Sequence, residues 1–278
     1  MDPNVDLLSL VLTLRPLEKT NSDRPLPRWW GRAAQALMLG TIQEYNAELA
    51  ETLHSDHEIR AFTTSTLMGR FPGWAFDRDQ PYTLRLTAME NEVAGILLQA
   101  AKDGPLATSS TVELDYFPFK IETSYWNPEE HPWAAVTTYQ DLSASRLLTE
   151  ERVPKRLEMQ FTSPTTFKSG GMHIPIPLPE LVFGSLLERW NAIAPLAFPE
   201  EAKRYAAECL AISRYKLSTR AVPLKGGGLR VGAVGKISYI SLNYDRYWMS
   251  VMATLAEFAL FSGAGAGTAM GLGQCKKM

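Results

Sequence analysis

Four histidines are the side chains in this sequence best suited to acid–base chemistry near neutral pH. Two of them, His54 and His57, lie three residues apart in LHSDHEIR, at the end of a helical pattern. They predict an acid–base pair or, with Asp56 or Glu58, part of a metal site. The sequence fixes no further His, Cys or Asp cluster, so we expect no metal and no cofactor. A histidine at a helix C-terminus also interacts favourably with the helix dipole without doing chemistry.

The other two histidines stand in loop-like contexts. His131 falls in a polar, proline-containing stretch, and His173 falls in SGGMHIP. We expect both to be structural or loop residues. Lys168 and Arg32 are candidate phosphate contacts, although most exposed charges are simply solvated.

Glycines dominate the segment 263–277, GAGAGTAMGLGQCKK, and are a second chemical signal. Glycine lets backbone amides approach an anion closely, so this density predicts a phosphate cradle. The dinucleotide pattern G-x-G-x-x-G fails, because its third glycine falls on Thr268 or Met270. A small-molecule enzyme that uses the loop for a nucleotide is therefore a weaker hypothesis than another phosphate-bearing partner. The five glycines are Gly263, Gly265, Gly267, Gly271 and Gly273.

Charge is distributed unevenly along the 278 residues. Residues 1–142 carry 11 Lys and Arg against 20 Asp and Glu, whereas residues 143–278 carry 17 against 10. A basic half is typical of a polyanion-binding surface, although two ordinary solvated surfaces would also explain it. Because the net charge is −2, any nucleic-acid site must be local.

Composition predicts a globular cytoplasmic protein. Hydrophobic residues make up 45% of the chain, and the two cysteines, Cys209 and Cys275, form no C-x-x-C pair, which suits a reducing compartment. We expect no secretory signal, and no apolar run approaches the roughly 18 residues of a membrane span.

The periodicities predict the same order of elements in each half. In the first half we expect strands over 5–14, 61–69, 81–88 and 111–125, and helices over 29–53 and 90–102. Residues 127–145 are expected to be a linker or long loop. In the second half we expect strands over 156–162, 210–222, 229–242 and 271–276, a Gly/Pro-rich connection over 167–179, and helices over 181–192, 200–209 and 247–260.

This order is β-α-β-β-α-β twice over, so the predicted fold class is α+β. It comprises two tandem ferredoxin-like domains, residues 1–142 and 143–278, with a C-terminal glycine-rich loop. Such an order, with the glycine loop between the last helix and the last strand, resembles the RAMP superfamily of CRISPR-associated proteins. Within it the chain is similar to the endoribonuclease that cuts precursor CRISPR RNA. The matching stretches are FTSPTTFKSGG (161–171), PIPLPELVFGSLLERWN (175–191), PLKGGGLRVGAVGKISY (223–239), GAGAGTAMGLGQ (263–274) and, in the first half, ELAETLHSDHEIRAFTTSTLMG (48–69).

The resemblance implies a metal-independent reaction. In that family the ribose 2′-OH attacks the adjacent phosphorus, giving a 2′,3′-cyclic phosphate and a 5′-OH. It implies that His54 is the catalytic histidine, with His57 as an exchangeable neighbour, and that Arg60 is the basic partner. The family often also supplies a tyrosine, but only Tyr45 lies near the corresponding region, so the third group stays unassigned.

The implied partner is CRISPR repeat RNA in precursor transcripts, with subunits of a CRISPR effector complex as further candidates, no membrane, and a monomer or a homodimer. A non-catalytic RAMP subunit that binds guide RNA is the alternative. Tyr215 and Tyr239 are candidates for base stacking or for the core. The residues expected to bind RNA are Lys168, Arg214, Lys216, Arg220, Lys225, Arg230, Lys236, Gly265, Gly267, Gly271 and Gly273.

Overall fold

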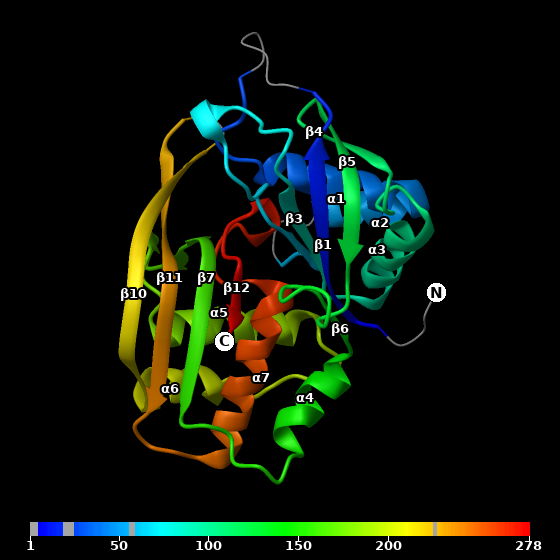
Figure 1. Cartoon of the computed structure of the whole chain (residues 1–278). Helices are drawn as coiled ribbons and strands as arrows, with labels where there is room; N and C mark the ends of the chain where they lie inside the picture. The colour runs from blue at the N-terminus through cyan, green and yellow to red at the C-terminus, as the bar shows by residue number, and fades with distance from the viewer. Residues whose placement is uncertain (1–4, 19–24, 56–58, 225–226) are drawn as a thin grey trace. The chain divides into compact units, whose positions relative to one another are not determined.

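The protein divides into two compact units, each described here by itself. The structure, a computed structural model, describes residues 5–18, 25–55, 59–224 and 227–278 (Figure 1). The first unit is Met1–Val136 with Ala269–Gly271, and the second is Thr137–Thr268 with Leu272–Met278. The division after Val136 differs from the expected boundary at 142/143, which falls inside a helix.

The first unit is a ferredoxin-like fold with one added strand. Its sheet has the order β2-β3-β1-β5-β4, and β6 also pairs with β1. Without β4, this is the strand order of a βαββαβ unit, in which the two central strands are the first and third. Its elements are β1 (Leu7–Pro16), α1 (Gly31–Tyr45), α2 (Ala47–Ser55), β2 (Phe62–Thr64), a 3-10 turn (Pro72–Trp74), β3 (Tyr82–Ala88), α3 (Asn91–Asp103), β4 (Thr111–Leu114), β5 (Phe117–Tyr125) and β6 (Ala135–Thr137).

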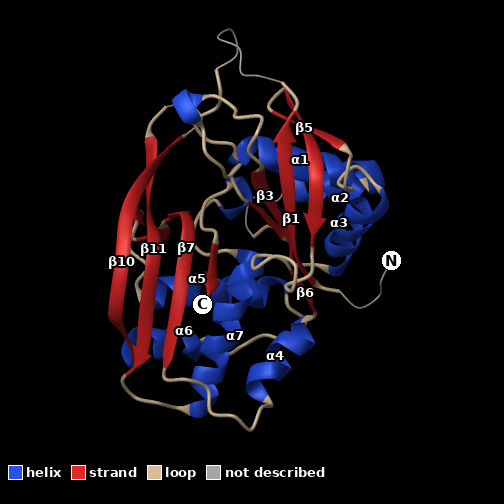
Figure 2. Cartoon of the chain, viewed as in Figure 1, coloured by secondary structure: helices blue, strands red, loops and turns tan. Residues whose placement is uncertain are grey.

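Alternate leucines of β1 build the core of the first unit. Leu8, Leu10, Leu12 and Leu14 are fully buried in one cluster with apolar residues of α1 and α3. Each fully buried leucine contributes about 1.5–3 kcal/mol, so the strand is fixed in register by its own sequence. The helices lie on one face of the sheet (Figure 2).

Two predicted strands of the first unit differ from those observed. The strand expected over 111–125 is a hairpin, because Asp115 (φ 50°) and Tyr116 (φ 69°) turn the chain between β4 and β5. Neither residue is a glycine, so the turn carries no strong sequence signal. The strand expected over 61–69 shortens to Phe62–Thr64, and Ser65 and Met68 form only isolated bridges.

The second unit repeats the fold. Its main sheet has the antiparallel order β10-β11-β7-β12, with β10 at one edge, and β8 and β9 form a separate hairpin. The prediction of two ferredoxin-like folds is confirmed. The elements of this unit are α4 (Tyr139–Leu147), β7 (Arg156–Thr165), β8 (Phe167–Ser169), β9 (Met172–Ile174), α5 (Pro179–Ile193), α6 (Glu201–Cys209), β10 (Leu210–Pro223), β11 (Leu229–Ser241), α7 (Arg246–Ser262) and β12 (Cys275–Lys277). A 3-10 turn (Thr268–Met270) begins in this unit and ends in the segment assigned to the first unit.

Three segments of the second unit differ from prediction. The stretch expected to be a linker contains α4, whose only buried residue, Tyr139, packs edge-on against Trp190 at 5.0 Å between ring centroids. The Gly/Pro-rich connection contains the β8–β9 hairpin. The last strand begins at Cys275 and not at Gly271, because Gly271 and Gly273 adopt positive φ.

None of the helices in the described part of the chain is both long and apolar enough to span a bilayer.

The N-terminus of α7 yields a stability prediction. Asp245 caps this largely buried helix, its Oδ1 accepting a hydrogen bond from the Trp248 amide at 3.0 Å. We expect Asp245→Ala to lower the free energy of unfolding by about 1 kcal/mol, and Asp245→Asn to change it by only a few tenths, since asparagine caps equally well. Urea denaturation measures both. Equal losses in the two variants would contradict a capping role.

Candidate functional site

His54 lies on the exposed side of α2. Leu53 and Ala50 anchor the helix in the core, whereas His54, in the last turn, is exposed. Its carbonyl oxygen accepts a hydrogen bond from Arg60 Nη2 at 3.4 Å. The structure therefore brings Arg60 to the end of α2, beside the residue with which sequence reasoning paired it.

Arg60 is held by an aromatic ring as well as by the helix end. Its guanidinium carbon lies 5.9 Å from the centroid of the Phe62 ring, at the start of β2. A guanidinium has five N–H donors, so the bond to the His54 carbonyl engages only part of its donor set. The arrangement keeps a delocalised positive charge at the end of the helix that carries His54.

The remaining members of the predicted catalytic region fall into two groups. His57, with Asp56 and Glu58, lies outside the described residues. Tyr45, at the end of α1, directs its hydroxyl against Gly104 at the end of α3, where a Cβ would collide with it. This tyrosine closes a helix–helix contact.

In the part of the chain that the structure describes, no three His, Cys, Asp or Glu side chains come close enough together to hold a metal ion.

The two other histidines have different surroundings. His131 stacks on Tyr125 at 5.6 Å between ring centroids, and its Nδ1 accepts from the Trp133 amide at 3.1 Å. His173 lies on exposed β9, where its Nδ1 is 3.1 Å from Arg230 Nη1. Lys168 is its cross-strand partner on β8. Sequence reasoning proposed Lys168 and Arg230 separately and set His173 aside, and the fold gathers all three.

Cations line β10 and β11 as expected. Arg214, Lys216 and Arg220 are exposed along β10, and Lys216 stands directly opposite Lys236 of β11. Like charges at directly opposite positions destabilise a sheet, so this pair favours an anionic partner. Lys225 lies outside the described residues.

The two candidate tyrosines separate into one exposed and one buried residue. Tyr215 is 68% exposed and can stack on a base. Tyr239 is fully buried and donates its hydroxyl to the Pro177 carbonyl at 2.7 Å. Burial raises the pKa of Tyr239 well above its usual value. Tyr239 is therefore a core residue.

Two glycines of the C-terminal loop, Gly265 and Gly273, are packed against the second unit. The Gly265 amide donates to Ser185 Oγ at 2.9 Å, and the Gly273 amide donates to the Pro164 carbonyl at 3.1 Å. The Gly265 carbonyl accepts from Arg189 Nη2 at 2.7 Å. The backbone amides of two of the four glycines expected to bind RNA thus donate hydrogen bonds within the protein. Contact with RNA through Gly267 and Gly271 stays a prediction.

Ser185 and Arg189 of α5 were missed from the sequence. They lie four residues apart on one helix face and both hold Gly265, through its amide and its carbonyl. Nothing in their spacing distinguishes them from ordinary solvated helix positions, so only the fold could find them. They are positioning residues for the loop.

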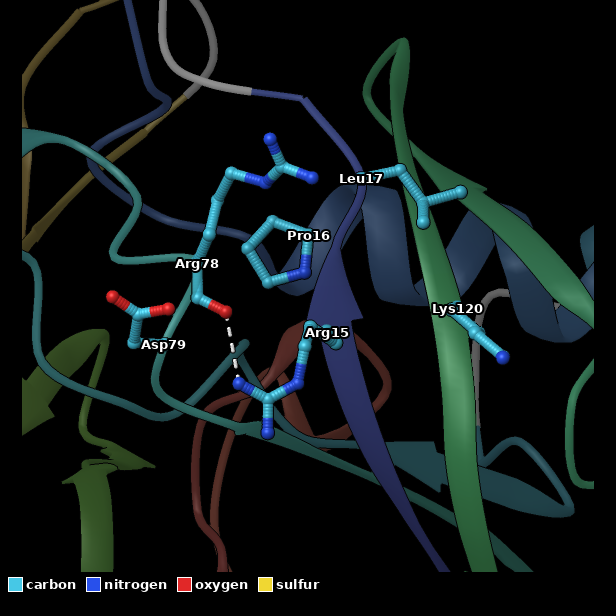
Figure 3. Close-up of a pocket in the computed structure, with 6 residues that line it drawn as sticks. All are labelled: Arg15, Pro16, Leu17, Arg78, Asp79 and Lys120. Atoms are coloured by element: carbon cyan, nitrogen blue, oxygen red, sulfur yellow. Dashed lines mark hydrogen bonds between the residues drawn. The ribbon is translucent and has the colours of Figure 1, made fainter.

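A shallow hollow of about 350 Å³ lies in the first unit (Figure 3). Arg15 in its wall pairs with Glu122, 2.5 Å from Nε to Oε1, and donates to the Arg78 carbonyl at 2.8 Å. The hydrogen bond to Glu122 raises the pKa of Arg15 above its usual value. We assign no chemistry to this hollow, since its lining holds no histidine. The lining residues are Arg15, Pro16, Leu17, Arg78, Asp79 and Lys120.

Comparison with known proteins confirms the resemblance inferred from the sequence. The family model of the CRISPR-associated endoribonuclease Cas6 matches residues 159–275. The CRISPR-associated endoribonuclease Cas6 of Mycobacterium tuberculosis (strain CDC 1551 / Oshkosh) is 29% identical over 121 residues, which span 43% of this chain and 38% of that relative. The sequence match therefore spans well under half of the curated relative.

Solved structures match over nearly the whole chain. A Cas6 product complex has a TM-score of 0.77 and 25% identity, with 98% of this chain and 99% of that chain covered. Thermus thermophilus Cas6 has a TM-score of 0.72 and 22% identity, with 99% of each chain covered.

Loop packing yields a prediction with a matched pair of variants. Gly265 (φ 77°) would bring a Cβ into collision with the Thr166 carbonyl oxygen, whereas Gly170 (φ 55°) has open space around it. We expect Gly170→Ala to cost about 1–2 kcal/mol from backbone strain alone, and Gly265→Ala to cost about 1–3 kcal/mol more from overpacking. Thermal and urea unfolding measure the difference. Equal costs would show that the main-chain contact does not constrain the loop.

His173 yields a prediction about titration. Burial, then the charges of Arg230 and Lys168, lower the pKa of His173 below its usual value. We expect Arg230→Gln to raise this pKa toward about 6.5, because it removes a cation that opposes protonation. A lowered folded-state pKa means that the unfolded chain binds more protons just below pH 6.5, so stability from this group rises with pH there. NMR titration of the imidazole measures the shift, and an unchanged or lower pKa would contradict the contact.

Proposed function

We propose that this protein is an endoribonuclease that cuts repeat RNA in precursor CRISPR transcripts and releases guide RNAs. The main support is a likeness to Cas6 structures over both ferredoxin-like units, combined with an exposed histidine and an arginine at the end of one helix. The basic second half supports an RNA partner.

The chemistry proposed for the cut is transesterification by the RNA itself. The 2′-oxygen attacks the adjacent phosphorus while its proton passes to a base. The bond from phosphorus to the 5′-oxygen then breaks, and that oxygen takes up a proton from an acid. The products are a 2′,3′-cyclic phosphate and a 5′-OH. Since the nucleophile belongs to the substrate, the step requires no metal-bound hydroxide.

His54 is the proposed acid or base. Its exposure lets a phosphodiester reach the ring, and an imidazole exchanges protons readily near neutral pH. Arg60 is the proposed stabiliser of the phosphorane, in which negative charge builds up on the equatorial oxygens. The hydrogen bond to the His54 carbonyl and the contact with Phe62 position the guanidinium beforehand.

Binding of the repeat RNA is assigned to the second unit. Arg214, Lys216, Arg220 and Lys236 supply exposed cations for phosphates, and Tyr215 supplies a ring for stacking. These contacts hold the backbone without reading bases.

A cleavage assay tests this proposal. Repeat RNA is incubated with the protein in EDTA, beside an RNA with one 2′-deoxy at the cut site and beside His54→Ala. We expect cleavage in EDTA, none of the deoxy RNA, and a loss of about 10²–10⁴-fold in the variant, as for a general acid–base group. His131→Ala is the matched control and should retain activity if the protein stays folded.

Three outcomes would count against the proposal. Full activity of His54→Ala would remove His54 from the mechanism, and cleavage of the deoxy RNA would exclude attack by the 2′-OH. Binding of repeat RNA without cleavage would identify a guide-RNA-binding subunit.

A further inference from the structure

Three donor groups meet on the β8–β9 hairpin of the second unit. Lys168 and His173 occupy directly opposite positions on the two strands, so their side chains share one face. Arg230, at the start of β11, places Nη1 3.1 Å from His173 Nδ1. These groups come from three strands and are separated by as many as 62 residues of sequence, so no local motif records them.

Hydrogen bonding fixes the state of the imidazole. A guanidinium only donates, so Nδ1 of His173 must accept, and the ring is then neutral with its hydrogen on Nε2. The charges that act on the ring are those of Arg230 and Lys168, and both lower the pKa of His173. The neutral ring therefore retains one N–H donor that points away from the guanidinium.

Among the described residues, neither of the two positive charges in the cluster has an ion-pair partner. In the described portion of the chain, none of the salt bridges involves Lys168 or Arg230. Two cations beside one ring repel each other, and an anion placed among them would relieve this repulsion.

The hairpin turn leaves room for such an anion. Gly170 and Gly171 form the turn at positive φ, and a Cβ added to either would meet nothing within 4 Å. Lys168 and His173 are both exposed. A phosphate group can therefore approach the cluster without moving the backbone.

We propose that Lys168, His173 and Arg230 form a phosphate-binding site that takes one phosphodiester of RNA, with His173 donating from Nε2. The inference rests on the proposed function for the identity of the partner. His173 here is a neutral hydrogen-bond donor and not an acid–base catalyst. Because all three groups contact a phosphate and none reads a base, the site acts on the backbone at any sequence.

Salt-dependent binding tests the site. The full-length protein is titrated against fluorescent repeat RNA with a 2′-deoxy at the cut site, so that cleavage does not interfere. We expect Lys168→Gln and Arg230→Gln each to weaken binding about tenfold, as for loss of a charged hydrogen bond. Lys203→Gln, an exposed lysine on α6, is the matched control and should bind normally.

The slope of affinity against salt reports the number of phosphates engaged. One phosphate contributes about 0.7 to the slope on single-stranded RNA. We expect the double variant Lys168→Gln/Arg230→Gln to lose about 0.7, because both cations hold the same phosphate. A loss of about 1.4 would indicate two separate contacts and overturn a shared site, and unchanged affinity would overturn the site altogether.

His173 variants test the neutral donor. His173→Gln keeps an N–H donor and should bind better than His173→Ala, with the fold of each checked by thermal unfolding. Equal binding by His173→Ala and the parent protein would remove His173 from the site. Weaker binding of an acidic peptide by the cation variants, with RNA binding unchanged, would assign the cluster to a protein partner and overturn the proposal.

The same measurements distinguish failure of the phosphate site from failure of the proposed function. If the cluster variants bind RNA normally while His54→Ala has lost cleavage, only the phosphate site fails. If the parent protein neither binds nor cuts repeat RNA, the proposed function fails and this inference fails with it.

Discussion

Main chain packs directly on main chain where the glycine-rich segment meets the end of β7, and the second unit depends on this contact. Ala266 donates to the Thr166 carbonyl at 2.8 Å, and Gly273 donates to the Pro164 carbonyl at 3.1 Å. Two backbones approach this closely only where a Cβ is missing, as at Gly265. The contact aligns β12 beside β7 and so completes the four-stranded sheet. The glycines of this segment therefore allow close backbone packing within the protein.

The acidic and basic halves of the sequence carry different proposed roles. The histidine proposed for the cut stands on α2 of the first unit, within the acidic half of the sequence, whereas the exposed cations stand on β10 and β11 of the second. A cation beside an imidazole opposes its protonation and lowers its pKa. His173, which does lie among cations, shows the effect on pKa.

Sequence periodicity predicted the fold wherever burial imposes a pattern. The Val/Leu-rich run of β1 predicts a buried strand and the amphipathic period of residues 90–102 predicts α3, because in both segments the apolar residues are the buried ones. Features that depend on a long-range contact or on an unusual backbone angle could not be predicted from the pattern. Tyr139 is the only buried residue of α4, so the sequence of this helix resembles a polar linker, and the turn at Asp115 and Tyr116 uses positive φ without glycine.

The residues of the candidate site could likewise be predicted only in part from the sequence. The family resemblance pairs Arg60 with His54, six residues earlier, and Arg60 lies at the end of the helix that carries His54. The meeting of His173 with Arg230 depends on how the hairpin lies beside β11, which no spacing encodes. The positions of Ser185 and Arg189 against Gly265 likewise depend on tertiary packing alone.

Strand β10 forms the edge of its sheet, and nine of its fourteen residues are exposed. A long open edge is a template on which another chain can add a strand, and charged side chains are a common protection against this. Arg214, Lys216 and Arg220 place like charges along this edge, which disfavours pairing with the same edge of a second copy. Substitution of these cations therefore affects the protection of the edge as well as the RNA binding proposed for them.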